Sequence, residues 1–385
     1  MGGVSSSIPI QNQFFPLEIL VTEKTYRIFT KDFSRTATES ELQNFTKGIL
    51  NCFYDIEKTI NKTKQLQLSP EECNQYLMEL AVWGRRAYQK FFNDDAQKTT
   101  YQYSQLFNKL APIFISEEVT FPWEVLYEGD TEEISLDKIW GLNYPVARRL
   151  NLKQSDFLSE QLSPLDMLFC LHHKLLQAHK HERPEIERIV RSTKGKFYLL
   201  ELSKEKPIKN GISFLKHLYQ TQHNIFHFAC HCRACKQYED EIDALVISII
   251  EGDSSAGEIE LETYNFLDVS GSFQCQPLIF LNACQSAGGF DDLRKTFNLP
   301  KEFIQRGAAA VIATACPVPD LFAAAFAQQF YKYFINQKMM IGEALCETRR
   351  YFLEEYNNPL GLAYGLYSSP YYKIAQKPGA VRINS

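Results

Sequence analysis

Two short apolar segments of this chain each end in a residue that could act in nucleophilic catalysis. Residues 224–231 read NIFHFACH and end at His231, and residues 278–284 read LIFLNAC and end at Cys284. In parallel α/β sheets chemistry gathers at the carboxyl ends of the strands, so neighbouring strands can bring two such side chains together across a cleft. The pattern therefore predicts a cysteine–histidine nucleophilic site.

The chemistry of such a site assigns a role to each residue. A thiol attacks an amide carbonyl as its thiolate, so Cys284 needs a base or a cation nearby, and His231 is the candidate. The same imidazole can later protonate the departing amine. The backbone N–H groups of Cys232 and Cys284 are candidates for holding the developing oxyanion. Spacing alone leaves a second interpretation open, in which the histidine and the cysteine only pack in the core.

The alternation of side chains along a strand distinguishes the two histidines of the first segment. His227, Ala229 and His231 are expected on one face, and Phe228 and Cys230 on the other. His227 lies in the middle of the strand, so we expect a hydrogen-bonded core residue that supports the site. His231 lies at the end, where a substrate can reach it.

A zinc site is a competing interpretation of the same segment, because thiolates and imidazoles are the usual zinc ligands. Its donors would be Cys230, His231, Cys232 and Cys235. If the strand continues to Cys232, however, His231 points away from the cysteines on either side of it, and no second ligand pair at finger spacing follows. We therefore expect no metal ligands here, and cysteine–histidine chemistry requires no cofactor.

A second group of metal-binding residue types occurs earlier in the chain. Cys170, His172 and His173 fall in an apolar stretch that we interpret as helical. In that setting, packing and surface roles are favoured over a metal site.

Composition limits the classes of function. The 385 residues, 45% apolar and 13% aromatic, can bury a large core. A net charge of -5, from 41 basic and 46 acidic residues, argues against nucleic-acid binding. The longest small or apolar run, residues 307–316, is about half of the roughly 20 residues that span a bilayer, and no secretory signal appears.

The number and spacing of the cysteines indicate the cellular compartment in which the protein works. Ten cysteines are spread irregularly, which favours reduced thiols over a disulfide framework and predicts a soluble, cytoplasmic protein without a membrane span. The first six residues, MGGVSS, match the N-myristoylation pattern, although a flexible Gly/Ser start is the favoured interpretation.

Residues 1–115 are predicted to form an N-terminal region of a hairpin and helices. Apolar residues 17–21 and 26–29 flank a short polar link, as in a hairpin. Two helices should follow, because each opens on a capping signal and continues with apolar residues at intervals of three and four. The capping residues are Ser40 with Gln43, and Ser69 with Pro70 and Glu72.

Beyond about residue 160, predicted strands and helices alternate. The strands are residues 197–202, 225–230, 244–250, 278–283 and 308–315, and the helices are residues 212–220, 300–307 and 321–335. Such alternation predicts an α/β fold with a mainly parallel sheet covered by helices on both faces.

The motifs around the histidine and the cysteine resemble those of CHAT-domain caspase-like peptidases, relatives of separase and the caspases. The two main boxes are FHFACH at residues 226–231 and LNACQSA at residues 281–287, and further similar segments lie at residues 121–126, 140–146, 303–308 and 313–320. The resemblance covers about residues 115–375. It implies a caspase-like domain over residues 116–385, with its catalytic α/β core at about 160–375.

Carried over to this sequence, the resemblance makes His231 the general base and Cys284 the nucleophile. Two positions depart from the family pattern. Cys232 stands where the family has a glycine that lets a backbone amide approach the substrate, and this bears on oxyanion stabilisation. Cys316 replaces an aromatic residue before the Pro-Val segment and alters a wall of the specificity pocket.

Asp320 has two open interpretations. It falls where separase relatives carry an acidic residue that recognises arginine before the scissile bond, and a carboxylate in a partly dehydrated pocket pairs well with a guanidinium. Alternatively, Asp320 caps the helix that is expected to begin at residue 321.

The resemblance implies a cysteine endopeptidase that cuts one or a few proteins through a thioester intermediate. The expected partner is a separately encoded protein, with a gasdermin-like pore former or another effector of antiviral defence as the family type. A regulator is expected on another polypeptide, since no sensor domain or repeat array is evident. The alternative from a different class is a caspase-like binding module without turnover.

Overall fold

The computed structural model describes most of the chain. The described residues are 15–21, 25–28, 31–34, 39–106, 109–116, 121–150, 160–161, 165–201, 208–237, 240–251, 254–283 and 298–374. The candidate nucleophile Cys284 and the N-terminal MGGVSS segment lie outside them, as does the side chain of Cys235.

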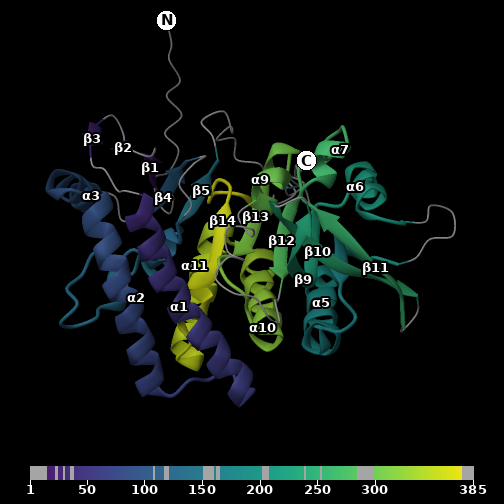
Figure 1. Ribbon diagram of the computed structural model, residues 1–385, viewed down its shortest axis with the longest axis horizontal. Helices are drawn as coiled ribbons and strands as arrows, with labels where there is room; N and C mark the ends of the chain where they lie inside the picture. Colours follow the sequence, from purple (N-terminus) through teal and green to yellow (C-terminus); the bar gives the residue numbers. More distant parts are fainter. Residues whose placement is uncertain are drawn as a thin grey trace, which may run out of the picture.

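A single large, mostly parallel sheet of 13 strands organises the described part of the chain (Figure 1). Along the sheet the order is β11-β10-β9-β12-β13-β14-β5-β4-β1-β2-β3, and β7 pairs with both β9 and β8. The strands at its centre, β8, β7, β9, β12 and β13, are mutually parallel. Their bounds are β7 (Asp166–Leu171), β8 (Lys196–Leu199), β9 (Ile225–Gln237), β12 (Leu278–Ala283) and β13 (Ala310–Thr314).

The remaining strands extend the sheet on both sides. On one side lie β10 (Asp240–Glu251) and β11 (Ser254–Glu262), both antiparallel to their neighbours. On the other lie β14 (Tyr364–Tyr367), β5 (Ala147–Arg149), β4 (Leu110–Ile115), β1 (Phe15–Val21), β2 (Thr25–Ile28) and β3 (Lys31–Ser34). A separate parallel pair joins β6 (Glu160–Gln161) and β15 (Lys373–Ile374).

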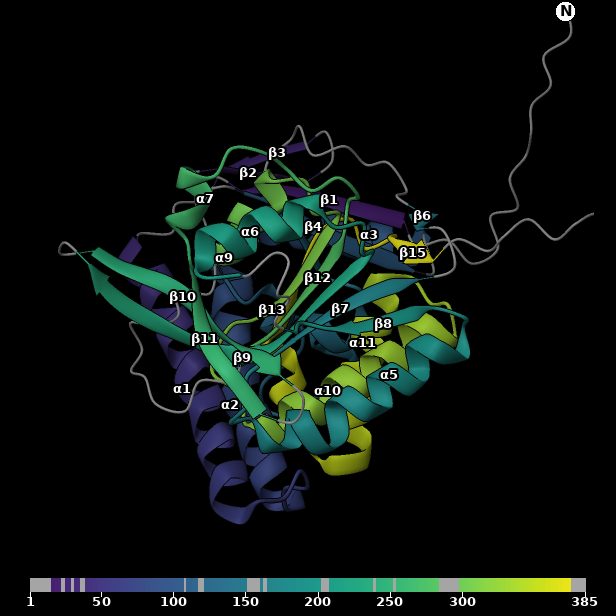
Figure 2. The same ribbon diagram turned by 90° about the vertical axis from the view of Figure 1, so that its right-hand side faces the viewer.

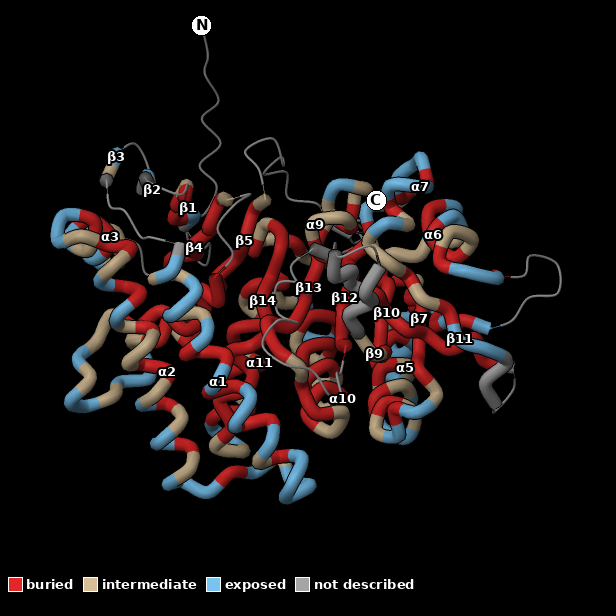
Figure 3. The backbone as a smooth tube through the Cα atoms, in the orientation of Figure 1, coloured by how far each residue is buried: buried red, intermediate tan, exposed pale blue. Residues whose placement is uncertain are grey.

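Helices cover both faces of the central sheet, so the predicted α/β fold class is confirmed (Figure 2). One face carries α6 (Gly211–Gln220), α7 (Asn265–Asp268) and α9 (Asn298–Gln305). The other carries η3 (Ala178–Glu182), α5 (Arg183–Ser192), α10 (Asp320–Tyr331), η5 (Lys332–Asn336) and α11 (Ile341–Tyr356). Short helical turns complete the chain: η1 (Trp123–Val125), η2 (Leu136–Lys138), α4 (Trp140–Asn143) and η6 (Pro359–Ala363). The strands between these layers are buried along most of their length (Figure 3).

The N-terminal region forms the predicted hairpin and helices. Strands β1 and β2 pair antiparallel, and α1 (Glu39–Thr63) packs beside α2 (Pro70–Phe91). The capping box at Ser69 is confirmed: its hydroxyl accepts the N–H of Glu72 at 3.1 Å, and the Glu72 carboxylate accepts the N–H of Ser69 at 2.9 Å. Helix α1 begins at Glu39, so Ser40 lies within the first turn and is not the cap. The predictions did not include α3 (Asp94–Leu106).

The N-terminal region shares the sheet with the rest of the chain, because β1 pairs in parallel with β4, and β4 pairs in parallel with β5. The division at residue 115 into two regions stays a prediction. Within the described residues, none of the helices is long and apolar enough to cross a membrane.

The helical interpretation of the stretch that contains Cys170, His172 and His173 is wrong. This stretch forms β7, and the two histidines follow directly after its last residue, Leu171. The run Met167–Leu171 is apolar at every position and buried between β8 and β9, and a short continuous apolar run does not distinguish a strand from a helix by its period.

Candidate active site

His231 lies where β9 leaves the parallel part of the sheet. Strand β9 continues to Gln237, so the expected end at residue 230 is too early. Its pairing with β7 and β12, however, stops at Ala229 and Cys230, and from His231 onward it pairs with β10. The last residue of β12, Ala283, is paired with Cys230. Cys284 and His231 are therefore the next residues along two adjacent parallel strands.

The predicted alternation along β9 is confirmed. Phe228 and Cys230 join the core beneath α6 and α9, and Cys232 packs against that same core. His227 lies on the opposite face, fully buried, with its ring stacked on Phe169 and Phe280 at centroid distances of 4.6 and 5.1 Å. Because the strand persists through Cys232, neighbouring side chains from 230 to 232 alternate between faces and do not converge on one metal ion.

His227 is the centre of a buried polar network that the sequence did not reveal. Its Nε2 lies 2.8 Å from Oε1 of Glu182, and its Nδ1 lies 3.0 Å from the Tyr331 hydroxyl. An ionised carboxylate is an acceptor only, so it accepts a hydrogen bond from Nε2, and Nδ1 faces the tyrosine hydroxyl. Burial raises the pKa of Tyr331 well above its usual value, which keeps that hydroxyl a donor.

The same network reaches the second strand of the site. The Asn282 amide donates to Glu182 at 2.6 Å and to the Ala323 carbonyl at 3.0 Å, and its oxygen accepts from the Tyr364 hydroxyl at 2.8 Å. Glu182, His227 and Asn282 are all buried. The network thus ties η3 and α10 to β9 and β12, just before the ends of the strands that carry His231 and Cys284, and we expect it to position those ends.

His172, which directly follows β7, borders the candidate base. Its ring meets that of His231 edge to face at 4.4 Å, and its backbone N–H bonds to the Ala229 carbonyl at 2.8 Å. Burial, followed by the charge of His231, lowers the pKa of His172 to about 4. His172 is therefore a neutral wall of the site at pH 7, not a competing base.

The Asp320 carboxylate does not cap its own helix, so that interpretation is wrong. The helix α10 begins at Asp320 itself and has no side-chain cap. Instead the carboxylate accepts the N–H of Gln177 at 2.8 Å and that of Ala178 at 3.2 Å, at the start of the helical segment that follows β7. Burial raises its pKa, while these two amides and the charge of His231 oppose the rise.

A small cavity lies beside the ends of the central strands. Its lining combines Cys232, Leu245, Leu281, Ala283, Leu299, Thr314, Cys316 and Pro317. Both positions that depart from the family pattern, Cys232 and Cys316, thus line one cavity next to the last described residue before Cys284. The role of the Cys232 backbone amide as an oxyanion donor stays a prediction.

Burial makes most of the described thiols poor nucleophiles. It raises the pKa values of seven of them, so they hold little thiolate at neutral pH. These are Cys52, Cys73, Cys170, Cys230, Cys275, Cys316 and Cys346.

The fold and the strand-end site define a mixed α/β protein with chemistry-bearing residues at the ends of parallel strands. A family model, described as CHAT domain, matches residues 99–372, which is well over half of the chain. The chain belongs to the CHAT-domain family, as its histidine and cysteine motifs predicted.

Three further proteins are similar to this chain. A "probable protease" of Vitiosangium sp. (strain GDMCC 1.1324) is 33% identical over 89 residues, which cover 23% of this chain and 11% of the relative. The separase–securin complex of Saccharomyces cerevisiae matches with a TM-score of 0.40 and 13% identity over 86% of this chain and 22% of that chain. The Arg-specific cysteine proteinase gingipain R matches with a TM-score of 0.44 and 10% identity over 95% and 80%.

Proposed function

We propose that this protein is a cysteine endopeptidase in which Cys284 is the nucleophile and His231 the general base. The observation that carries the proposal is the register of β9 and β12: Ala283 pairs with Cys230, and the two candidate residues follow directly. Membership of the CHAT-domain family and a relative named as a probable protease support the same reaction class.

The reaction is acyl transfer in two halves. His231 takes the thiol proton, and the thiolate sulfur attacks the carbonyl carbon while the backbone N–H groups of Cys232 and Cys284 hold the oxyanion. The C–N bond then breaks, His231 gives its proton to the amine, and a thioester remains. Water, deprotonated by His231, attacks the thioester and releases the carboxylate product and the thiol. This sequence uses no cofactor.

The substrate is proposed to be a separately encoded protein that is cut at one or a few sites. A gasdermin-like pore former or another defence effector is the type that the family resemblance favours. The eight described cysteines that are free thiols suit a reducing, cytoplasmic compartment. Terminal sequencing of fragments that appear with the wild type, and not with Cys284→Ala, identifies the substrate among candidate partners.

An electrophilic probe tests the proposal against the alternative of a silent binding module. A peptidyl acyloxymethyl ketone should label Cys284 of the wild-type protein, because a thiolate beside an imidazole attacks it. Peptide mapping by mass spectrometry locates the adduct. The label should disappear in Cys284→Ala and persist in Cys275→Ser, a half-buried thiol near the opposite ends of the strands. A wild-type protein that stays unlabelled at Cys284 would support the silent module.

Asp320 is proposed to recognise a basic residue before the scissile bond in addition to holding the segment at residues 177–178. A carboxylate has about four lone-pair sites, so two backbone amides leave acceptor capacity for a guanidinium. The electrostatic interaction between Asp320 and His231 supports its proximity to the site.

A peptide library separates these roles of Asp320. Recognition predicts a wild-type preference for Arg or Lys that collapses in both Asp320→Ala and Asp320→Asn. Anchoring alone predicts unchanged preference and a loss of stability in Asp320→Ala of about 1 kcal/mol, smaller in Asp320→Asn, which keeps an oxygen acceptor. A wild-type preference for an apolar or acidic residue eliminates the recognition role.

A further inference from the structure

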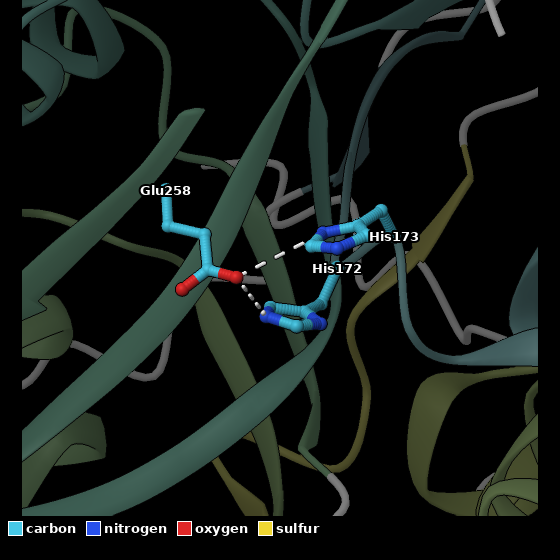
Figure 4. Close-up of side chains that lie close together, drawn as sticks. All are labelled: His172, His173 and Glu258. Carbon is cyan, nitrogen blue, oxygen red and sulfur yellow. Dashed lines mark ion pairs between the residues drawn. The ribbon is translucent and has the colours of Figure 1, made fainter. Parts of the chain in front are cut away.

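Two histidines and a glutamate converge beside the candidate base. His172 and His173 follow β7, and Glu258 comes from β11 (Figure 4). In the sheet, β9 and β10 lie between β7 and β11. One ligand atom from each of the three residues lies within 4.8 Å of the other two. The Oε1 atom of Glu258 is 3.4 Å from Nε2 of His172 and 3.9 Å from Nδ1 of His173. We propose that these three residues form a binding site for Zn²⁺.

Two of the three donor separations are close to what zinc requires, and the third lies within 4.8 Å. Zn–N and Zn–O bonds of about 2.0–2.2 Å in a tetrahedron place neighbouring donor atoms roughly 3.3–3.5 Å apart. The His172–Glu258 separation already has this value, and the His173–Glu258 separation exceeds it slightly. Two imidazoles and one carboxylate are a typical zinc donor set, and three protein ligands leave the fourth position for water.

The donors are held in place by residues behind them. Ser248, fully buried on β10, accepts the backbone N–H of His173 at 3.0 Å, and its hydroxyl lies 2.7 Å from Nδ1 of the same ring. Ser248 is also the residue paired with Glu258 in the β10–β11 ladder. The two imidazoles stack at 5.0 Å. Ser248 fixes the backbone of His173, but its hydroxyl lies at Nδ1, the nitrogen that faces Glu258, so zinc coordination at this nitrogen must displace that hydrogen bond.

One lysine opposes metal binding at this site. The Lys174 ammonium lies 3.5 Å from Oε1 of Glu258, and its side chain is 66% exposed. An exposed ion pair is worth little, so zinc can displace this ammonium into solvent. Replacement of Lys174 by alanine should therefore strengthen zinc binding. If the three residues form only an ion-paired cluster with no affinity for metal, neither the wild type nor the Lys174→Ala variant should bind zinc.

Zinc at this site should slow the proposed cleavage, an effect that rests on the proposed function. His172 contacts the ring of His231 at 4.4 Å. Zinc on His172 would draw that ring toward Glu258 and shift the wall against which the His231 ring packs, so the base would be less well placed to take the thiol proton. The site would then act as a reversible zinc brake on the protease.

Zinc titration of the full-length chain against a chromophoric chelator tests the site without any activity. Wild type should bind one Zn²⁺, and Glu258→Gln and His173→Ala, which each remove a direct ligand, should each weaken binding by at least the roughly 10- to 100-fold that loss of an outer partner costs. Lys174→Ala should bind at least as tightly as wild type. Cys284→Ala should also bind like wild type, which separates this site from zinc on the nucleophile. Urea unfolding midpoints show whether each variant is folded.

Two results overturn the zinc site: a wild type that binds no zinc, or Glu258→Gln and His173→Ala variants that are folded and bind it as wild type does.

The effect of zinc on the proposed protease is measured as the rate of probe labelling at Cys284 with zinc and with EDTA. Zinc should slow labelling in wild type and much less in Glu258→Gln, whereas equal slowing in both refutes the brake. If zinc binds and Cys284 is never labelled, the proposed protease function fails while the metal site stands.

Discussion

The variants Cys284→Ala and His231→Ala should both lose peptide cleavage while remaining folded. Without the thiol no thioester can form, so Cys284→Ala should show no turnover above background. Without the imidazole, the thiol keeps its proton and the amine leaves unprotonated, which should lower kcat/KM by roughly 10²- to 10⁴-fold. Initial rates on a peptide that the wild-type protein cleaves give both values.

A histidine outside the site provides the matched control for this experiment. His217 lies in the last turn of α6, on the face of the sheet opposite to His227 and Glu182. His217→Ala should keep kcat/KM within a few-fold of wild type, and thermal unfolding compares the stabilities of all variants. A folded His231→Ala variant that cleaves within a few-fold of wild type shows that the general base is elsewhere.

The sequence predicted those parts of the fold that local patterns determine. The capping box at Ser69 and the apolar period after it depend on residues within one or two turns, so α2 was recognisable. The alternation along β9 likewise follows from the pleat, which puts His227 and Cys230 on opposite faces whatever surrounds them. The end of β12 at Ala283 was predicted from the end of its apolar run, whereas β9 continues past its predicted end to Gln237.

Local sequence patterns could not predict contacts between residues that are far apart in the chain. Glu182 and Asn282 are 100 residues apart in the sequence, and a glutamate near a helix start reads as a surface residue until its buried partners are known. Asp320 and Ala178 are separated by 142 residues, so a local cap was the simpler interpretation of the aspartate. Strand β7 was missed because a run that is apolar at every position has no hydrophobic period to distinguish a strand from a helix. For the same reason the sequence did not predict that His172 lies beside His231.

A second group of long-range partners forms a buried charge cluster outside the site. Glu124, in η1, is 1% exposed and pairs with both nitrogens of the Arg148 fork at 2.5 Å. Arg349 of α11 approaches the same carboxylate at 3.4 Å and is also 1% exposed. Further donations to the carbonyls of Phe121 and Tyr364 complete the cluster. One carboxylate therefore balances two buried guanidinium groups.

Glu124→Ala should destabilise the fold more than any exposed substitution. It leaves the Arg148 and Arg349 charges buried and close to one another, and loss of one member of a buried ion pair costs about 3–5 kcal/mol. Glu18→Gln is the matched control, because Glu18 pairs with the buried Arg149 at 3.2 Å but is itself 43% exposed, and glutamine keeps an oxygen acceptor, so this change should cost less than Glu124→Ala. Urea unfolding followed by tryptophan fluorescence measures both values.

Probe labelling of the same two variants separates stability from chemistry. Glu124 contacts no member of the network of Glu182, His227 and Asn282, which the cluster meets through Tyr364, so the folded fraction of Glu124→Ala should still label at Cys284 at the wild-type rate. A Glu124→Ala protein that unfolds no more easily than Glu18→Gln would mean that the two arginines are stabilised by their carbonyl partners and not by the carboxylate. A protein that is fully folded but unlabelled would instead couple this cluster to the site through Tyr364 of β14, which accepts from Arg349 and donates to Asn282.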